Sequence, residues 1–157
     1  LLPRLALDLL KIDGIHHVDS LMGTHDLMIN VKSNSIKALY FLINSEIRKF
    51  EGIYNLKILF IEKVNKWNAW GGMKIKMSLR AVIFCKVEHK AMVRVLEALE
   101  KIPEIKKVFS LTGEYDIIAE LEVENSDELY EVFAENVDRI DGIINTNTHI
   151  VMKSFEK

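Results

Sequence analysis

The chain has 157 residues, a formal net charge of -2, 49% hydrophobic residues and 28% charged residues. These are the proportions of a globular protein, and the length allows one ordinary domain or two small ones. No apolar run approaches the roughly 20 residues that cross a bilayer, and Leu1-Leu2-Pro3-Arg4 lacks the features of a secretory signal. The single cysteine, Cys85, excludes an intrachain disulfide and a cysteine-built metal site. We therefore expect a cytoplasmic protein with no membrane contact.

Charge is distributed unevenly, because residues 81–157 carry 16 Asp and Glu against 9 Lys and Arg. Neither half of the chain is basic enough to suggest a nucleic-acid surface. We expect no direct nucleic-acid contact from this chain.

The first half alternates helix and strand patterns. A leucine and isoleucine stripe over 2–12 predicts a helix, and 15–22 and 26–32 predict the two strands of a hairpin. A second apolar stripe over 39–50 predicts another helix, which Gly52 ends. The segment 54–63 predicts a last strand. A linker follows over 66–78, in which Gly71 and Gly72 indicate a turn, and Trp67 and Trp70 could stack on a ligand or pack the linker against a domain.

The second half gives a complete set of elements. Strands are predicted over 79–87, 105–111, 117–124 and 144–152. A helix is predicted over 89–101, which Pro103 terminates. Asn125 with Glu128 three residues later resembles a capping box that opens a second helix, and Gly142 follows its end. The order is β-α-β-β-α-β, the ferredoxin-like arrangement.

The two halves repeat with a constant shift of 90 residues. Two Gly-x-x-Asp turns show it most clearly, Gly23 to Asp26 and Gly113 to Asp116, and apolar positions match around them. The sequence therefore predicts an α+β fold of two tandem ferredoxin-like βαββαβ units, paired as in a dimeric α/β-barrel. We expect a first copy over 1–65, a linker over 66–78 and a second copy over 79–157.

The first copy has no counterpart of the strand 79–87 before Leu1. We expect either that the chain lacks its natural start or that a strand from elsewhere fills the gap. The candidates for such a strand are a partner chain and the linker segment Met73-Lys74-Ile75-Lys76-Met77.

The two glycine turns have two possible roles. Glycine allows a positive φ and leaves backbone N–H groups open to a carboxylate, while Asp116 could hold the ammonium group of the same ligand. Alternatively, Gly113 and Asp116 only shape a tight hairpin, with the carboxylate accepting hydrogen bonds from turn amides.

Residues 111–116, Leu-Thr-Gly-Glu-Tyr-Asp, resemble the effector-binding (RAM) domain of the leucine-responsive/AsnC (Lrp/AsnC) transcription regulators. Lys101 to Ile105 before them, and Asp141-Gly142-Ile143 and Thr146-x-Thr148 after them, resemble the same domain. The resemblance implies a small effector, an amino acid, bound near the turns, and homo-oligomers formed through the sheet faces. It implies these ligand-binding residues: Thr112, Gly113, Glu114, Tyr115, Asp116, Thr146, Thr148, Gly23 and Asp26.

The chain also departs from that family. It contains no helix-turn-helix pattern, and it carries two copies of the unit in place of one. The first copy has Leu56 and Ile58 where the second has Thr146 and Thr148. We therefore expect the second turn to bind the ligand and the first to serve mainly as scaffold.

Other candidate chemistry is weaker. His16 and His17 alternate along a strand and cannot chelate one metal together, and His25 lies in the same hairpin, so no metal site is expected. Glu120, Glu122 and Glu124 share a strand face, whose matching positions in the first copy include Asn30 and Lys32. We interpret this face as a solvated acidic edge; the alternative is that face-to-face pairing of the two copies brings the two sets together. Cys85 is expected in the core. No cofactor motif or phosphate loop is present.

The sequence thus favours a sensing and oligomerisation module of an Lrp/AsnC-type regulator that binds and does not catalyse. The alternatives are a structural pairing domain that modulates a DNA-binding partner, or an enzyme similar to the siroheme decarboxylases that resemble this family.

Overall fold

A computed structural model describes residues 2–68 and 78–157 of the chain. The expected turn at Gly71 and Gly72, Trp70 and the candidate filler strand Met73–Met77 lie outside the described residues. The chain divides into two compact units. Unit 1 comprises Leu1–Lys57 and Val151–Lys157, and unit 2 comprises Ile58–Ile150.

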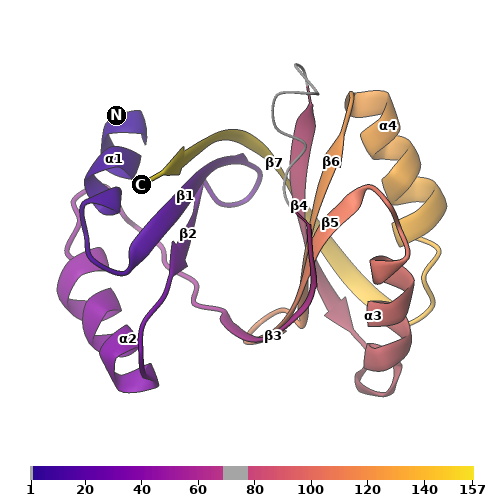
Figure 1. The fold of residues 1–157 in the computed structure, drawn as a ribbon, viewed down its shortest axis with the longest axis horizontal. Coiled ribbons are helices and arrows are strands. Elements are labelled where there is room, and N and C mark those ends of the chain that lie inside the picture. Colours follow the sequence, from indigo (N-terminus) through magenta and orange to yellow (C-terminus); the bar gives the residue numbers. More distant parts are fainter. Residues whose placement is uncertain (1, 69–77) are drawn as a thin grey trace. The chain divides into compact units, whose positions relative to one another are not determined.

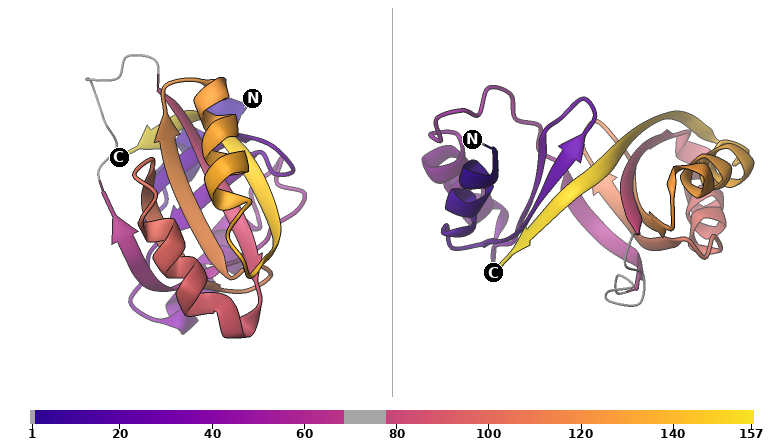
Figure 2. Two further views of the ribbon diagram at one scale, coloured as in Figure 1. Left: turned by 90° about the vertical axis from the view of Figure 1, so that its right-hand side faces the viewer. Right: turned by 90° about the horizontal axis from the view of Figure 1, so that it is seen from above.

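Unit 2 is an antiparallel sheet covered by helices on one face (Figures 1 and 2). Its hydrogen-bonded strand order is β7-β4-β6-β5-β3. The strands are β3 (Phe60–Trp67), β4 (Leu79–Val87), β5 (Ile105–Thr112), β6 (Ile117–Val123) and β7 (Ile143–Glu156), of which the last six residues belong to unit 1. The covering segments are the 3-10 turn η3 (His89–Ala91), α3 (Met92–Glu100), α4 (Ser126–Glu131) and the π-turn η4 (Val132–Val137).

The core of unit 2 lies between the sheet and these helices. Alternate residues of β4, namely Ala81, Ile83 and Cys85, are fully buried against the apolar stripe of α3, which includes Val95 and Leu99. Cys85 is thus a core residue, which confirms its interpretation from the sequence. Burial of this apolar stripe is what holds the two helices on the sheet.

Unit 1 contains α1 (Leu2–Leu10), β1 (Ile15–Met22), β2 (Leu27–Val31), α2 (Ile36–Leu42) and the π-turn η1 (Ile43–Ile47). Its hydrogen-bonded strand order is β2-β1-β7, where the C-terminal residues of β7 lie beside β1. Ala6, Leu9, Ile15, Val18, Ile43 and Ile47 are buried in its interior. The residue bounds of α1 and of the β1-β2 hairpin agree closely with the ranges predicted from the sequence.

The two hairpins pair in the same register. In unit 1, Ile15 faces Val31, His17 faces Asn30 and Ser20 faces Leu27. Each pair of β1 and β2 recurs 90 residues later in unit 2, as Ile105 with Leu121, Lys107 with Glu120 and Ser110 with Ile117. Both hairpins also have a β-bulge at the same place, between Ile15 and His17 and between Ile105 and Lys107.

Helix starts recur at the same shift. The Ser35 hydroxyl accepts a hydrogen bond from the Ala38 N–H at the start of α2, and the Asn125 amide oxygen accepts one from the Glu128 N–H at the start of α4. The Glu128 carboxylate in turn accepts the Glu124 N–H at 2.8 Å. The predicted side-chain cap at Asn125 is therefore confirmed.

Two sequence predictions about strands are wrong. The expected strand 54–63 begins only at Phe60, because β3 is defined by its pairing with β5, from Phe60 opposite Thr112 to Trp67 opposite Lys107, and Tyr54 is 98% exposed. The expected solvated acidic edge is wrong for two of its three residues. Glu120 and Glu122 are 7% and 6% exposed, as every residue of β6 is buried, whereas Glu124, just beyond the strand, is exposed.

None of the helices among residues 2–68 and 78–157 is long and apolar enough to cross a membrane.

Candidate functional site at the Gly113 turn

Gly113 lies in the turn between β5 and β6 with a φ of 147°. A side chain at this position would place its Cβ 2.6 Å from Leu59 Cδ2 and 3.3 Å from the Ile58 carbonyl oxygen. Both the backbone conformation and the close approach of the segment before β3 therefore require glycine. The turn itself is open to solvent, because Thr112, Gly113 and Glu114 are exposed.

Asp116 fixes the base of this turn with three hydrogen bonds. Its carboxylate Oδ2 accepts the Val87 N–H at 2.8 Å, and its own N–H donates to the Cys85 carbonyl at 2.9 Å. Its carbonyl accepts the Leu111 N–H at 2.8 Å. Asp116 thus ties the hairpin to the end of β4 through a charge-assisted bond.

Thr112 connects the turn to β3, because its hydroxyl donates to the Glu62 carboxylate. Two positions further into the strand pair, the Ser110 hydroxyl donates to the Asn65 side-chain oxygen at 2.7 Å. The residue pairs follow the β3-β5 ladder, in which Lys63 faces Ser110 and Phe60 faces Thr112. One side of the turn is therefore lined by polar groups of β3 that the sequence prediction did not include.

Tyr115 belongs to a small aromatic cluster below the turn. Its ring centroid lies 5.6 Å from that of Phe84, which in turn lies 5.4 Å from the His149 ring in an edge-on arrangement. Asn147 Nδ2 donates to the Tyr115 hydroxyl at 3.4 Å. Such aromatic contacts favour one fixed position of the Tyr115 ring.

Thr146 and Thr148 are half-buried on β7. Side chains alternate along a strand, so these threonines point to the face opposite that of Asn147 and His149, which contact the aromatic cluster. The structure thus brings Asn147 to Tyr115, while Thr146 and Thr148 lie on the other face of β7. Alternation along β7 is the sequence signal that could have selected Asn147, because it places Asn147 on the same face as His149 of the aromatic cluster.

The corresponding turn in unit 1 differs. The Asp26 carbonyl accepts the Leu21 N–H at 2.8 Å, as the Asp116 carbonyl does from Leu111. Gly23 and Asp26 are both exposed, but Gly23 is not among the glycines with positive φ, which are Gly14, Gly52, Gly113 and Gly142. The expectation of a positive φ is therefore correct at Gly113 and wrong at Gly23.

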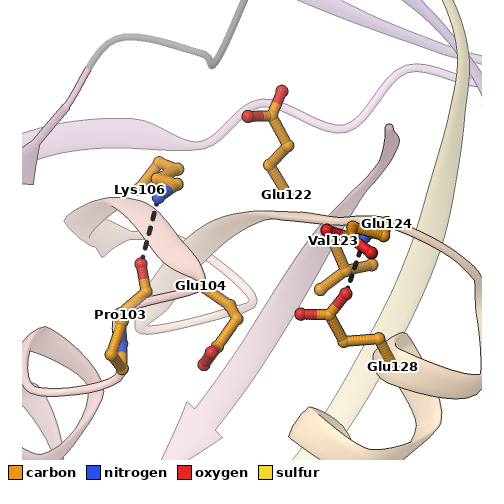
Figure 3. A pocket seen from close by; sticks show the side chains of 7 residues that line it. All are labelled: Pro103, Glu104, Lys106, Glu122, Val123, Glu124 and Glu128. Carbon is orange, nitrogen blue, oxygen red and sulfur yellow. Dashed lines mark hydrogen bonds between the residues drawn. The ribbon is translucent and has the colours of Figure 1, made fainter. Parts of the chain in front are cut away.

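A separate hollow of about 190 Å³ opens on unit 2 away from the turn (Figure 3). Pro103, Val123, one lysine and four glutamates line it: Lys106, Glu104, Glu122, Glu124 and Glu128. Lys106 Nζ donates to the Pro103 carbonyl at 3.2 Å. The excess of carboxylates disfavours an anionic ligand here, and the hollow contains no predicted site residue.

Sequence reasoning missed a polar cluster in unit 1. His17 Nε2 lies 2.7 Å from Asp19 Oδ1 and His17 Nδ1 lies 2.6 Å from Glu156 Oε1, while the Ser154 hydroxyl donates to the same Asp19 oxygen at 2.5 Å. The hydrogen bond that the His17 ring donates to the Asp19 carboxylate raises the pKa of His17, burial acts in the opposite direction, and Glu156 adds to the rise. No sequence signal links residues 17 and 156, because they meet only through the pairing of β1 with β7.

Metal and thiol chemistry find little support in the parts of the chain that the structure describes. No group of three or more His, Cys, Asp or Glu side chains within residues 2–68 and 78–157 is arranged to hold a metal ion. Burial raises the pKa of the Cys85 thiol to about 12, and Asp116 adds to the effect. The thiol is therefore protonated at neutral pH and a poor nucleophile.

Comparison with known proteins identifies the family that this site resembles. Residues 80–157 match the family model of the Lrp/AsnC ligand binding domain. The HTH-type transcriptional regulator FL11 of Pyrococcus horikoshii is 35% identical over 80 residues, which are 51% of this chain and 52% of FL11. The FL11 regulator of Pyrococcus abyssi is 25% identical over 159 residues, which cover 99% of this chain and 91% of that protein.

The chain thus spans about half the length of the first of these relatives. Among solved structures, the siroheme decarboxylase NirDL aligns over 99% of this chain and 68% of its own, with a TM-score of 0.68 and 10% identity, which shows a shared mixed α+β fold and no more. By sequence, residues 80–157 are similar to the ligand binding domain of the Lrp/AsnC family, and their curated relatives are transcriptional regulators.

Proposed function

We propose that this chain is the amino-acid-sensing module of an Lrp/AsnC-type transcription regulator and that it works by binding a ligand. The observation that carries the proposal is the Gly113 turn, which is exposed yet rigidly held, within the segment that matches the Lrp/AsnC ligand binding domain. A preorganised turn loses little conformational entropy when it captures a ligand.

The proposed roles follow the contacts of the turn. The backbone around Gly113 faces solvent and is suited to a ligand carboxylate, since glycine leaves the neighbouring N–H groups accessible. The Thr112 hydroxyl donates to Glu62 and thereby holds that carboxylate beside the turn. Glu114 and Glu62 provide carboxylates for the ammonium group. Asp116 has a different role, because its carboxylate accepts the Val87 N–H and positions the turn.

We infer that the module consists of two tandem copies of one unit, over 1–65 and 79–157, with a linker over 66–78. The identical pairing register and bulge of the two hairpins support the inference, as do the equivalent caps at Ser35 and Asn125. In this proposal the second copy binds the ligand. The first copy, with Gly23 and Asp26 at its turn and no threonines at 56 and 58, serves as scaffold.

We further propose that the chain forms homo-oligomers through its sheet faces and that the ligand favours one assembly over another. A ligand shifts such an equilibrium only by its difference in affinity for the two states. Sedimentation analysis with and without the ligand measures that shift. If the mass is the same with and without the ligand, the module binds its ligand without changing its assembly, and this part of the proposal is wrong.

Isothermal titration calorimetry of the chain against each of the twenty amino acids tests the ligand. We expect at least one to bind, and Thr112→Val to weaken it by about tenfold through the loss of one hydrogen bond. Thr24→Val is the matched control, because Thr24 is an exposed threonine of the equivalent turn in unit 1.

Two outcomes would refute the proposal. One is the absence of heat from all twenty amino acids. The other is equal loss of affinity in Thr112→Val and Thr24→Val, which would place the ligand away from the Gly113 turn.

A further inference from the structure

The polar cluster of unit 1 holds the end of β7 against β1, the strand beside it (Figure 1). His17 and Asp19 lie on β1, whereas Glu156 lies on the part of β7 that belongs to unit 1. His17 Nε2 is 2.7 Å from Asp19 Oδ1, and His17 Nδ1 is 2.6 Å from Glu156 Oε1. One imidazole ring therefore connects two strands that are distant in the sequence.

These two short contacts define the charge of the His17 ring. A neutral imidazole has one N–H group and one nitrogen lone pair, whereas an imidazolium has two N–H groups. An ionised carboxylate only accepts hydrogen bonds. Because each ring nitrogen faces a carboxylate oxygen, both bonds form together with ionised carboxylates only when the ring is protonated.

The groups that surround His17 were checked element by element. Among the described residues, the hydrogen bond to Asp19 on β1 raises the pKa of His17 most, burial lowers it, and Glu156 on β7 raises it further. From β2, the uncharged Asn30 lies opposite His17. The ammonium group of Lys157 donates to the Ile12 carbonyl at 2.7 Å. One carboxylate from each of the two strands thus holds the proton.

Loss of this proton affects the two bonds unequally. The Asp19 side chain is 2% exposed, whereas that of Glu156 is 67% exposed. A buried carboxylate that loses a hydrogen bond is costly, but water can solvate an exposed one. The neutral ring therefore keeps its remaining N–H on Asp19 and releases Glu156, which would otherwise face a nitrogen lone pair.

The end of β7 is the part of the strand that responds. Phe155 is 9% exposed, and the Lys157 N–H donates to the His16 carbonyl at 3.3 Å, which is a long bond. Strand ends open at a lower free energy than the middle of a sheet. Without the bond to Glu156, local opening is favoured, and it uncovers Phe155 and the edge of β1 on which β7 lies.

The equivalent strand pair of unit 2 is held without a histidine. At the positions 90 residues away, the four residues of the cluster are replaced by Lys107, Phe109, Val64 and Lys66. Val64 lies opposite Phe109 in the β3-β5 ladder, and Trp67 packs edge-on against Phe109 with ring centroids 5.9 Å apart. This pair of strands therefore serves as an internal reference.

We propose that the proton on His17 is a switch that keeps residues 154–157 attached to β1, and that loss of the proton releases them. Attachment is complete in acid and is lost as the pH rises through the titration of His17, because the raised pKa means that the attached form binds the proton more tightly. The proposal does not depend on the amino-acid site, since none of these residues belongs to it.

NMR of the whole chain between about pH 5 and about pH 9 tests the switch. The His17 ring Cε1–H signal gives the titration, and carbon-13 relaxation at Cα gives backbone order without relying on amide protons. We expect the order parameters of residues 154–157 to fall from about 0.85 toward 0.6 with the same midpoint as the His17 signal. Those of β3 should stay constant.

Two variants separate the switch from a general effect of pH. In Glu156→Gln, the amide N–H can donate to the unprotonated ring nitrogen, so the strand should stay attached across the whole pH range. His16→Gln is the matched control, because His16 is exposed and alternation places its side chain on the other face of β1. It should leave both midpoints unchanged.

The proposal fails on any of three results. The first is constant order in residues 154–157 while His17 titrates. The second is release of these residues in Glu156→Gln at the same pH as in the parent chain. The third is a parallel loss of order throughout unit 1, which would assign the proton to the stability of the whole unit and not to the end of β7.

Discussion

Asp116 offers the sharpest test of how the Gly113 turn is held. Its carboxylate accepts the Val87 N–H at 2.8 Å, and Val87 is 7% exposed. In Asp116→Ala this buried N–H loses its acceptor, which costs about 2 kcal/mol because the bond is charge-assisted and water has little access. Asp116→Asn keeps an acceptor oxygen but not the charge, and we expect it to cost about half as much.

Urea unfolding measures the effect, with intrinsic fluorescence as the signal, since Trp67 packs edge-on against Phe109 of unit 2 with ring centroids 5.9 Å apart. The matched control is Asp26→Ala, which removes the equivalent but exposed carboxylate of unit 1 and should cost less than about 0.5 kcal/mol. Equal destabilisation by Asp116→Ala and Asp26→Ala, or no destabilisation by either, would refute a structural role for Asp116.

The remaining predictions concern three other positions. Gly113→Ala should destabilise unit 2 by about 2 kcal/mol, since it combines a positive φ with a close contact to Leu59, whereas Gly23→Ala should be nearly neutral; equal thermal shifts would contradict this. The bond to Asp19 raises the pKa of His17 above 6.5, so its stabilisation of unit 1 should be complete below that pH and lost as the pH rises through the raised value. Amide exchange of β1 across that pH range should show the loss of protection, and His17→Gln should abolish the pH dependence of this protection. Cys85, with a pKa of about 12, should react with a thiol reagent at pH 8 about a thousandfold more slowly than a free cysteine until urea unfolds the chain.

Part of the candidate site could be predicted from the sequence and part could not. The turn residues from Thr112 to Asp116 are contiguous, so a short motif locates them. The contacts that determine their roles come from distant segments, namely Val87, Glu62 and Asn147. Asp116 shows the difference, because the residue type allows either a ligand contact or a structural bond, and only the tertiary structure shows its bond to Val87 at the end of β4.

The sequence by itself determined the local elements: the two hairpins, the apolar stripes of α1 and α3, and the cap at Asn125. These depend on interactions between residues close in the chain, so periodicity and capping residues are sufficient to predict them. Only the tertiary structure decided that β3 pairs with β5 and that the end of β7 pairs in unit 1 beside His17. These strands pair across sequence separations of 45 to 139 residues. Their pairing depends on which strand edges meet, and the sequence of one strand does not identify the strand to which its backbone hydrogen bonds form.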